Sequence, residues 1–295
     1  MNKTIKINFT NFWIDFKKKD NIFFNLLSDF CNVEISEEPD ILFFSVNDDL
    51  NDHKLFDCIK VFYSGEPISP NFNECDYSFS FDFIDSYKHF RLPGFVVWPM
   101  VSDNTQTKNK KVYINSYERL LNKEVCDELW ERNFCNFIYS NPNCQKRNDF
   151  FEKLSSYKKV DSGGNYKNNI GGSIFNKLEF QSKYKFSIAF ENTEYLGYTS
   201  EKITNAMLAN SIPIYWGNPL ISKDLNKDSF INYYDFKNEK DLIDYIIFLD
   251  NDKEEYLKKL NKSWLVDNKL NNNFSRESIK NFLIQIVNKI NKNDY

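Results

Sequence analysis

Charged and amide side chains are concentrated in one short stretch, residues 191–202, which has the sequence ENTEYLGYTSEK. Lys202 follows Thr199 and Ser200, whose hydroxyls suit a helix N-cap, so we expect the lysine in the first turn of a helix. A helix N-terminus offers free N–H groups and a partial positive charge, and with an added lysine it suits a phosphate or diphosphate. Polar candidates in the same stretch are the carboxylates of Glu191 and Glu201, the amide of Asn192 and the phenol of Tyr198. These residue types together predict a pocket for a nucleotide sugar.

Glu66, in the first half of the chain, is a candidate general base. Glu66 follows the apolar run Ile59 to Tyr63, on the turn Ser64-Gly65-Glu66-Pro67. Transfer of a group to a hydroxyl needs a base that removes the proton, and a carboxylate at the end of a strand can do this. The spacing by itself favours an exposed turn glutamate, so the assignment needs further support.

A glycine-containing loop and a helix start are further candidates in the second half. Gly163 and Gly164 lie in the loop 162–169, where the missing side chains let the backbone come close to a ligand. Arg147 lies in the first turn of a helix predicted over Gln145 to Tyr157. We expect the loop to approach a bound ligand.

These residues must be positioned by the ends of buried strands. Tyr184 to Phe190 and Ser211 to Gly217 are short apolar runs on either side of residues 191–202 and are predicted as strands. The first half alternates predicted strands with a helix, at 4–9, 22–30, 33–36, 41–46, 59–63 and 77–83. This rhythm predicts the α/β class with parallel sheets, in which ligands bind at the carboxyl ends of the strands. The competing interpretation of Glu201 and Lys202 is a solvated helix face.

The stretch around these residues resembles a known signature. FENTEYLGYTSEKITNAMLANSIPIYWGNP resembles the donor-binding pattern of the α-1,3-fucosyltransferases, glycosyltransferase family 10. That pattern is approximately F-E-N-(x)4-G-Y-(x)2-E-K-(x)2-(D/N)-A, followed by P-(I/V)-Y-W-G-(x)-P. Further segments resemble the bacterial members in the same order, from VFYSGE at 61–66 to SFIN at 229–232. The resemblance therefore covers roughly residues 59 to 236.

The resemblance implies a fold and a reaction. The fold would be GT-B, with two Rossmann-like domains facing across a cleft. The reaction would be inverting transfer of L-fucose from GDP-β-L-fucose to a hydroxyl of a β-galactosyl-containing, lactosamine-type glycan, at O3 of N-acetylglucosamine. Two alternatives stay open: a GT-B transferase that uses another nucleotide sugar, and a non-catalytic protein that binds nucleotides or carbohydrates.

The resemblance also implies roles for the candidate residues. Glu66 would be the general base, and Lys202 would hold the diphosphate. The fucose hydroxyls, or the positive charge at its anomeric carbon, would be met by Glu201, Glu191 and Asn192. Tyr198 would pack on the donor or hydrogen-bond to it.

One departure from the family concerns the loop that contains Gly163 and Gly164. Relatives are expected to carry an arginine there that contacts the diphosphate, and Lys167 occupies the apparent position. A lysine keeps the charge but loses the two-pronged hydrogen bonding of a guanidinium. Whether Lys167 or Arg147 meets the diphosphate is left open by the sequence.

No metal is required by these residues. The Asp-x-Asp spacing that holds Mn²⁺ in other glycosyltransferases occurs at Asp250 and Asp252, after a predicted helix and at an expected surface turn. We therefore expect no metal site and no required cofactor, with Mn²⁺ or Mg²⁺ acting at most as a stimulant of GDP release.

Composition and length bound the remaining expectations. The 295 residues suggest two domains, placed at 1–133 for the acceptor and 134–275 for the donor. A net charge of -4 argues against nucleic acid as a partner. The six cysteines show no C-x-x-C pair, which fits reduced thiols in a cytoplasmic protein, and no apolar segment is long enough for a signal or an anchor. A soluble, bacterial-type member of the family is therefore expected.

The last segment, 276–295, is predicted to begin with an amphipathic helix over Arg276 to Ile290. We expect this helix to pack back across the domains. The alternative is weak peripheral contact with a membrane through the apolar face. The polar segment 102–111 is expected to be an exposed loop.

Overall fold

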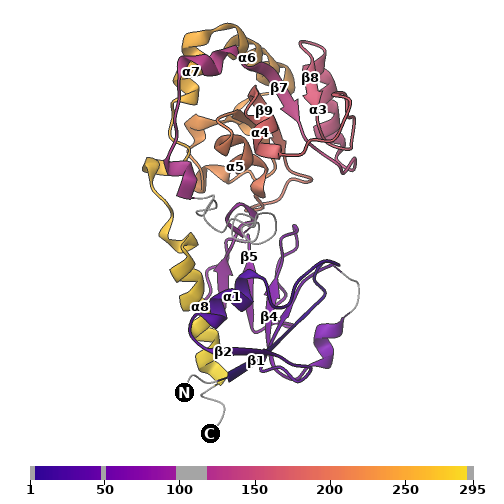
Figure 1. The fold of residues 1–295 in the computed structure, drawn as a ribbon, viewed down its shortest axis with the longest axis vertical. Coiled ribbons are helices and arrows are strands. Elements are labelled where there is room, and N and C mark those ends of the chain that lie inside the picture. The colour runs from indigo at the N-terminus through magenta and orange to yellow at the C-terminus, as the bar shows by residue number, and fades with distance from the viewer. Residues whose placement is uncertain (1–3, 48–50, 98–117, 291–295) are drawn as a thin grey trace. The chain divides into compact units, whose positions relative to one another are not determined.

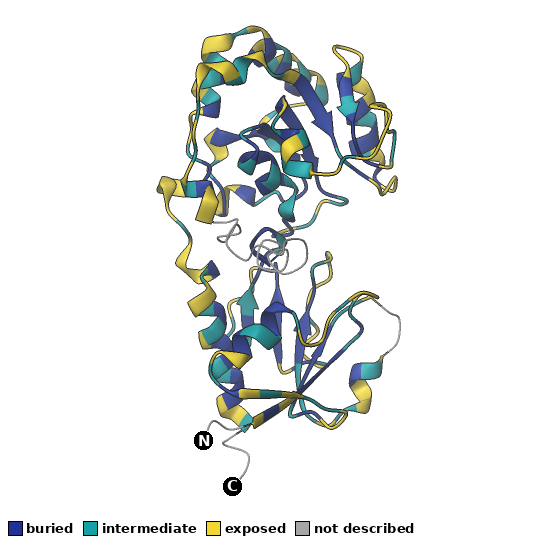
Figure 2. Cartoon of the chain, in the orientation of Figure 1, coloured by how far each residue is buried: buried dark blue, intermediate teal, exposed yellow. Residues whose placement is uncertain are grey.

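The computed structural model describes residues 4–47, 51–97 and 118–290 (Figure 1). The predicted loop at 102–111 lies outside these ranges. The chain divides into two compact units, the first formed by Met1–Val112 with Asn271–Tyr295 and the second by Tyr113–Leu270. Each unit contains a parallel β-sheet whose strands are mostly buried (Figure 2).

The sheet of the first unit has the strand order β2-β1-β3-β4-β5-β6, and all neighbouring pairs are parallel. Its strands are β1 (Thr4–Thr10), β2 (Asn32–Ile35), β3 (Ile41–Phe44), β4 (Ile59–Tyr63), β5 (Tyr77–Ser80) and β6 (His89–Arg91). The carboxyl ends of β1, β3 and β4 therefore lie on one edge, where the polar turn that contains Glu66 begins.

Two helices pack on this sheet. Helix α1 (Ile22–Ser28) is capped by Asn21, whose side chain accepts hydrogen bonds from two backbone N–H groups. Helix α8 (Arg276–Ile290) begins and ends where the sequence predicts. Its Phe282 ring meets the rings of Tyr77 and Phe79 edge to face, at 6.0 and 5.1 Å. The apolar face of α8 is thus buried within the first unit and is not available to a bilayer.

The sheet of the second unit has the order β11-β10-β9-β7-β8, again with parallel pairs. Its strands are β7 (Asn133–Phe137), β8 (Val160–Ser162), β9 (Tyr184–Phe190), β10 (Ile212–Trp216) and β11 (Ile231–Asn232). Its α-helices in the described ranges are α3 (Gln145–Ser155), α4 (Lys177–Gln181), α5 (Glu201–Leu208), α6 (Glu239–Asn251) and α7 (Lys253–Leu260). Helix α5 connects the two central strands β9 and β10, so its N-terminus lies at their carboxyl edge.

The boundary between the units differs from the sequence-based division at residue 133. The segment 118–133 groups with the second unit. Arg132 donates hydrogen bonds to the backbone oxygens of Ala209 and Asn210, at 3.1 and 2.8 Å, and Asn210 donates to the backbone oxygen of Glu124. These contacts attach the segment to the end of α5, which no local pattern in the sequence indicates.

The sequence led us to expect reduced cysteine thiols and no membrane-spanning segment. All six cysteines are free thiols, and four of them are buried. No helix in the described ranges is both long and apolar enough to cross a bilayer.

Candidate functional site

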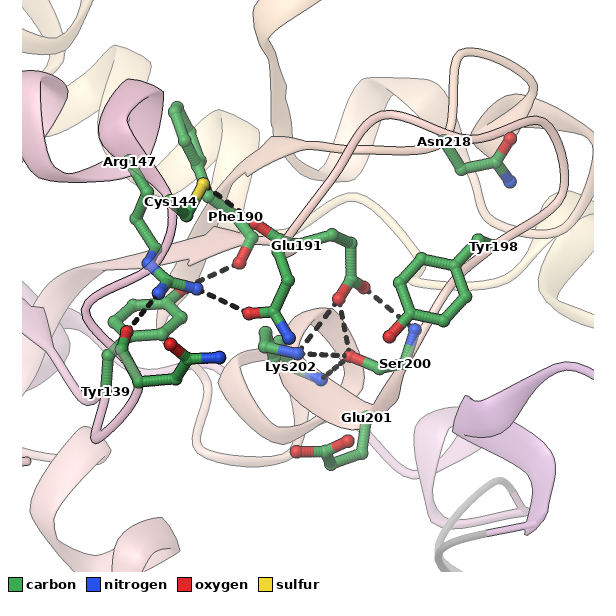
Figure 3. Close-up of polar contacts among 12 residues, drawn as sticks. Tyr139, Cys144, Arg147, Phe190, Glu191, Tyr198, Ser200, Glu201, Lys202 and Asn218 are labelled. Carbon is green, nitrogen blue, oxygen red and sulfur yellow. Dashed lines mark hydrogen bonds and ion pairs between the residues drawn. The ribbon is translucent and has the colours of Figure 1, made fainter. Parts of the chain in front are cut away.

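Glu191 is the centre of a polar cluster at the carboxyl end of β9. It directly follows the last residue of the strand, and its side chain is fully buried. Its Oε1 accepts from the backbone N–H of Ser200 at 2.8 Å, and its Oε2 accepts from the Ser200 hydroxyl at 2.7 Å and from Lys202 Nζ at 3.0 Å (Figure 3). Both carboxylate oxygens are therefore engaged by the start of α5.

Lys202 is the partly exposed cation of this cluster. Its Nζ also lies 2.9 Å from the hydroxyl of Ser200, the N-cap residue of α5, and its side chain is 18% exposed. Burial alone would lower the pKa of Lys202, but the charges of Glu191 and Glu201 outweigh burial and raise it above its usual value. The structure thus holds a charged ammonium at a helix N-terminus, where the backbone itself favours anions.

Glu201 is the second carboxylate at the start of α5, and its side chain points away from Glu191 (Figure 3). Its Oε1 lies 3.5 Å from Lys177 Nζ. Burial would raise the pKa of Glu201, but Lys177 and Lys202 outweigh that effect and lower it. Glu201 is therefore ionised at neutral pH and is available to stabilise positive charge.

Arg147 adds a second cation from α3. Its side chain is fully buried, and its guanidinium donates to Asn192 Oδ1 at 2.7 Å and to the backbone oxygen of Asn141 at 2.5 Å. The guanidinium carbon lies 4.0 Å from the centre of the Tyr139 ring, and Nε has no hydrogen-bond partner. Arg147 and Lys202 bind the neighbouring residues Asn192 and Glu191, so the two cations lie against the same short segment. Within the described residues no carboxylate pairs with Arg147, which favours an anionic ligand nearby.

Two residues after β10 hold the cluster in place. Gly217 has φ +148, and a Cβ there would lie 2.4 Å from Glu191 Cγ, so only glycine lets the Glu191 side chain pass. Asn218 is fully buried, accepts from the backbone N–H of Gly197 at 2.8 Å and donates to Thr199 Oγ1 at 3.0 Å. These residues position the N-cap of α5, and the only sign of this in the sequence is their place in the motif IYWGNP.

We predict that Gly217→Ala destabilises the protein by about 1–3 kcal/mol, because the added Cβ overlaps the buried Glu191 side chain. Chemical unfolding measures the loss, and GDP affinity should fall with it, since Glu191 aligns Lys202. Gly172→Ala is the matched control, because a Cβ at Gly172 meets nothing within 4 Å. Equal stability of the two variants would contradict the packing argument.

Tyr198 and Asn192 are two further candidate residues from the sequence. Tyr198 is buried, and its backbone oxygen accepts from the hydroxyl of Tyr215 at 3.5 Å. Figure 3 places the Tyr198 ring on the Ser200 side of the cluster. Asn192 accepts a hydrogen bond from Arg147 through its side-chain oxygen. Asn192 is thus in direct contact with one of the two cations.

Gly163 and Gly164 lie close to other parts of the protein itself. A Cβ at Gly164 would lie 2.1 Å from the backbone oxygen of Tyr139, and a Cβ at Gly163 would lie 2.8 Å from Ile174. Both glycines therefore allow close packing of the protein on itself. Lys167, with φ +53, forms an ion pair with Glu152. The structure brings Arg147, rather than Lys167, to the cluster around Lys202.

Glu66 lies in the first unit, on an exposed turn after β4. The turn is closed by Ser64, whose hydroxyl accepts from the Glu66 N–H at 3.0 Å and donates to the Glu66 backbone oxygen at 2.8 Å. Burial, and then the negative charge of Glu66, raise the pKa of Tyr63. This arrangement leaves the Glu66 side chain accessible at the carboxyl edge of the sheet.

The two aspartates with metal-binding spacing have structural roles. Asp250 is buried and forms ion pairs with Lys185 and with Lys158, the latter at 2.9 Å. The Asp252 side chain caps α7 by accepting from the backbone N–H of Glu255. Within the described part of the chain, no three acidic, histidine or cysteine side chains gather as a metal site would require.

Comparison with known proteins gives matches in both units. The family model for glycosyltransferase family 10 (fucosyltransferase), C-terminal part, matches residues 129–295, and that for the α-(1,3)-fucosyltransferase FucT N-terminal domain matches residues 7–98. The α-(1,3)-fucosyltransferase FucT of Helicobacter pylori is 39% identical over 220 residues, which are 68% of this chain and 46% of that protein. The chain thus matches less than half the length of this relative.

Solved structures agree with the family matches. A crystal structure of an α1,3-fucosyltransferase is similar with a TM-score of 0.81 and 33% identity, over 97% of this chain and 91% of that one. A crystal structure of an α1,3-fucosyltransferase with GDP-fucose has a TM-score of 0.78 at 33% identity, over 96% and 90% of the two chains. These similarities confirm the predicted GT-B fold of two parallel-sheet α/β domains.

Proposed function

Because the chain belongs to glycosyltransferase family 10, the fucosyltransferases, we propose that it catalyses inverting transfer of L-fucose from GDP-β-L-fucose to a sugar hydroxyl. The proposed acceptor is a lactosamine-type glycan, with O3 of N-acetylglucosamine as the receiving atom. The main support is the partly exposed Lys202 ammonium at the N-terminus of α5, with the Arg147 guanidinium close by. Two cations at the N-terminal end of a helix suit the diphosphate of a nucleotide sugar.

The proposed reaction is a single displacement at the anomeric carbon of fucose. The acceptor oxygen forms a bond to the anomeric carbon of fucose while the bond from that carbon to the diphosphate breaks. Glu66 takes the hydroxyl proton, and GDP leaves with the bonding electron pair. Lys202 and the N-terminus of α5 stabilise the negative charge that grows on GDP. Glu201 stabilises the positive charge that develops at the anomeric carbon.

The buried geometry changes the role that we propose for Glu191. Its carboxylate is fully buried, and both oxygens bond to Ser200, with Lys202 sharing one of them. A carboxylate in this state is a positioning group for the lysine rather than a ligand of the fucose hydroxyls. The sugar hydroxyls are left to Glu201 and Asn192, and Tyr198 packs on the donor.

The direct test is GDP release from GDP-fucose, measured with and without N-acetyllactosamine. We expect acceptor-dependent release, with the fucosylated trisaccharide detected by mass spectrometry. The activity should persist with a chelator, since Lys202 and Arg147 supply the positive charge that a metal would otherwise provide. Acceptor-dependent release from a different sugar nucleotide alone would replace fucose in the proposal. Tight GDP-fucose binding with no product would favour a non-catalytic binding protein.

The place of action in the cell is also a proposal. The described helices give no membrane span, and the apolar face of α8 is buried on the first sheet. We propose a cytoplasmic enzyme without stable membrane attachment. Fractionation of cells that produce the protein would place it in the soluble fraction, and recovery with the membranes after a salt wash would contradict this.

A further inference from the structure

A small apolar cavity lies in the first unit, in the loop between β1 and α1. Its volume is about 80 Å³, and its walls are mainly aromatic, from Phe12, Phe16, Phe23 and Tyr63. Its rim also carries polar side chains, among them Asp15 and Lys17. Apolar walls with a few polar groups at the edge are typical of small-molecule sites.

The loop holds an exposed tryptophan in a fixed position. Asn11 has φ +58 and turns the chain directly after β1. The Trp13 ring meets the Phe16 ring edge to face at 5.0 Å, and Phe16 stacks on Phe12 at 4.1 Å. Trp13 is nevertheless 36% exposed. A rigid, partly exposed indole costs little entropy to use as a contact surface, which is why such rings are common in binding sites.

One wall of the cavity belongs to the strand that leads to Glu66. Tyr63, which forms one wall, is the last residue of β4 and stacks on Phe12 with the rings nearly parallel, at 5.9 Å and 6°. Glu66 follows three residues later, and its charge contributes to the raised pKa of the Tyr63 phenol after the larger effect of burial. All of these residues belong to one compact unit. A sugar whose hydroxyl is at Glu66 would therefore have this cavity beside it.

The size of the cavity selects the kind of group that fits. A dry cavity of about 150 Å³ accepts a benzene ring, so a space of half that volume is too small for a sugar ring. It holds a substituent of a few heavy atoms. Its aromatic walls favour an apolar end such as a methyl group, and its rim can meet an attached amide.

We propose that this cavity receives the N-acetyl group of the acceptor N-acetylhexosamine, with the Trp13 indole packing against the sugar. The inference rests on the proposed fucosyl transfer and deepens it, because it assigns the residues that recognise the acceptor. A fitted pocket for one small apolar group usually gives a ratio of kcat/KM of about 10 to 200 between substrates with and without that group.

The test compares two acceptors that differ at one substituent, N-acetyllactosamine and lactose. The wild-type protein should show kcat/KM about 10- to 200-fold higher for N-acetyllactosamine. Val97→Met places extra atoms at the cavity wall. The ratio of the two kcat/KM values should then fall to nearly one, chiefly because kcat/KM for N-acetyllactosamine decreases. Titration with GDP and thermal unfolding of the variant show whether it is folded and binds the nucleotide.

A matched pair on the exposed loop gives a second test that does not disturb the core. Trp13→Ala should raise KM for both acceptors, whereas Ile14→Ala, at the fully exposed neighbour outside the cavity lining, should leave both KM values unchanged. Equal kcat/KM for the two acceptors, or a preference that Val97→Met leaves intact, would overturn the cavity assignment alone. Absence of transfer to either acceptor would overturn the proposed function as well.

Discussion

Glu66→Gln is expected to lower kcat for fucosyl transfer by about 10²- to 10⁴-fold, because the amide keeps the shape but cannot accept the acceptor proton. Glu66 lies on an exposed turn closed by backbone bonds to Ser64, so the fold should be unaffected. GDP-fucose affinity should barely change, since the donor cluster around Lys202 is in the other unit. Steady-state transfer to N-acetyllactosamine measures the first effect, and calorimetric titration with GDP measures the second.

Glu37→Gln is the control for Glu66→Gln, because it makes the same change at another exposed site of the first unit. Near-normal transfer by Glu66→Gln would refute the assignment of the base. The search would then turn to Asp85. Asp76 is a poor substitute, since its carboxylate accepts from the Lys60 N–H at the opposite, amino end of β4.

Lys202→Met is expected to cause two large losses. It leaves the fully buried Glu191 carboxylate without its ionic partner, which typically costs about 3–5 kcal/mol of stability. It also removes the ammonium that is proposed to meet the diphosphate, so GDP-fucose binding should weaken about 10- to 150-fold. Chemical unfolding and donor titration measure the two losses separately.

A double variant separates the structural loss from the loss of binding. Glu191→Gln together with Lys202→Met removes both charges and should recover much of the stability, because no uncompensated charge stays buried. Donor affinity should stay low, since the ammonium is still missing. If Lys202→Met bound GDP-fucose normally, Lys202 would be a structural partner of Glu191 only. If the double variant regained donor binding, the phosphate role of the lysine would be wrong.

Long apolar patterns allowed parts of the fold to be predicted from the sequence. The bounds of β9 and α8 agree with prediction to the residue, because each has an unbroken apolar run or face between polar flanks. β11 has only two residues, because the Asn232 side chain accepts from the Tyr234 N–H and starts a tight turn. β8 and α4 are too short to show a hydrophobic periodicity, and they form because they pack on neighbouring elements.

The motif ENTEYLGYTSEK by itself determined that Glu191 and Lys202 would be close. Glu191 follows a strand and Lys202 is in the first turn of the next helix, and only a short loop joins the two elements. The identity of the second cation was decided only by tertiary structure. Arg147 and Lys167 are both remote from the motif in sequence, and the packing of α3 directs Arg147 to Asn192, while Lys167 pairs with Glu152.

The burial of Glu191 likewise could not be predicted from the sequence. A glutamate, a serine and a lysine near a helix start are equally compatible with a solvated surface, and the residue types alone favour that outcome. In the fold, Gly217 approaches the Glu191 side chain and the start of α5 covers the carboxylate. The local sequence therefore determined which groups would meet. The tertiary structure decided that Glu191 would be enclosed while Lys202 stays accessible, because enclosure depends on chain segments that only long-range packing brings together.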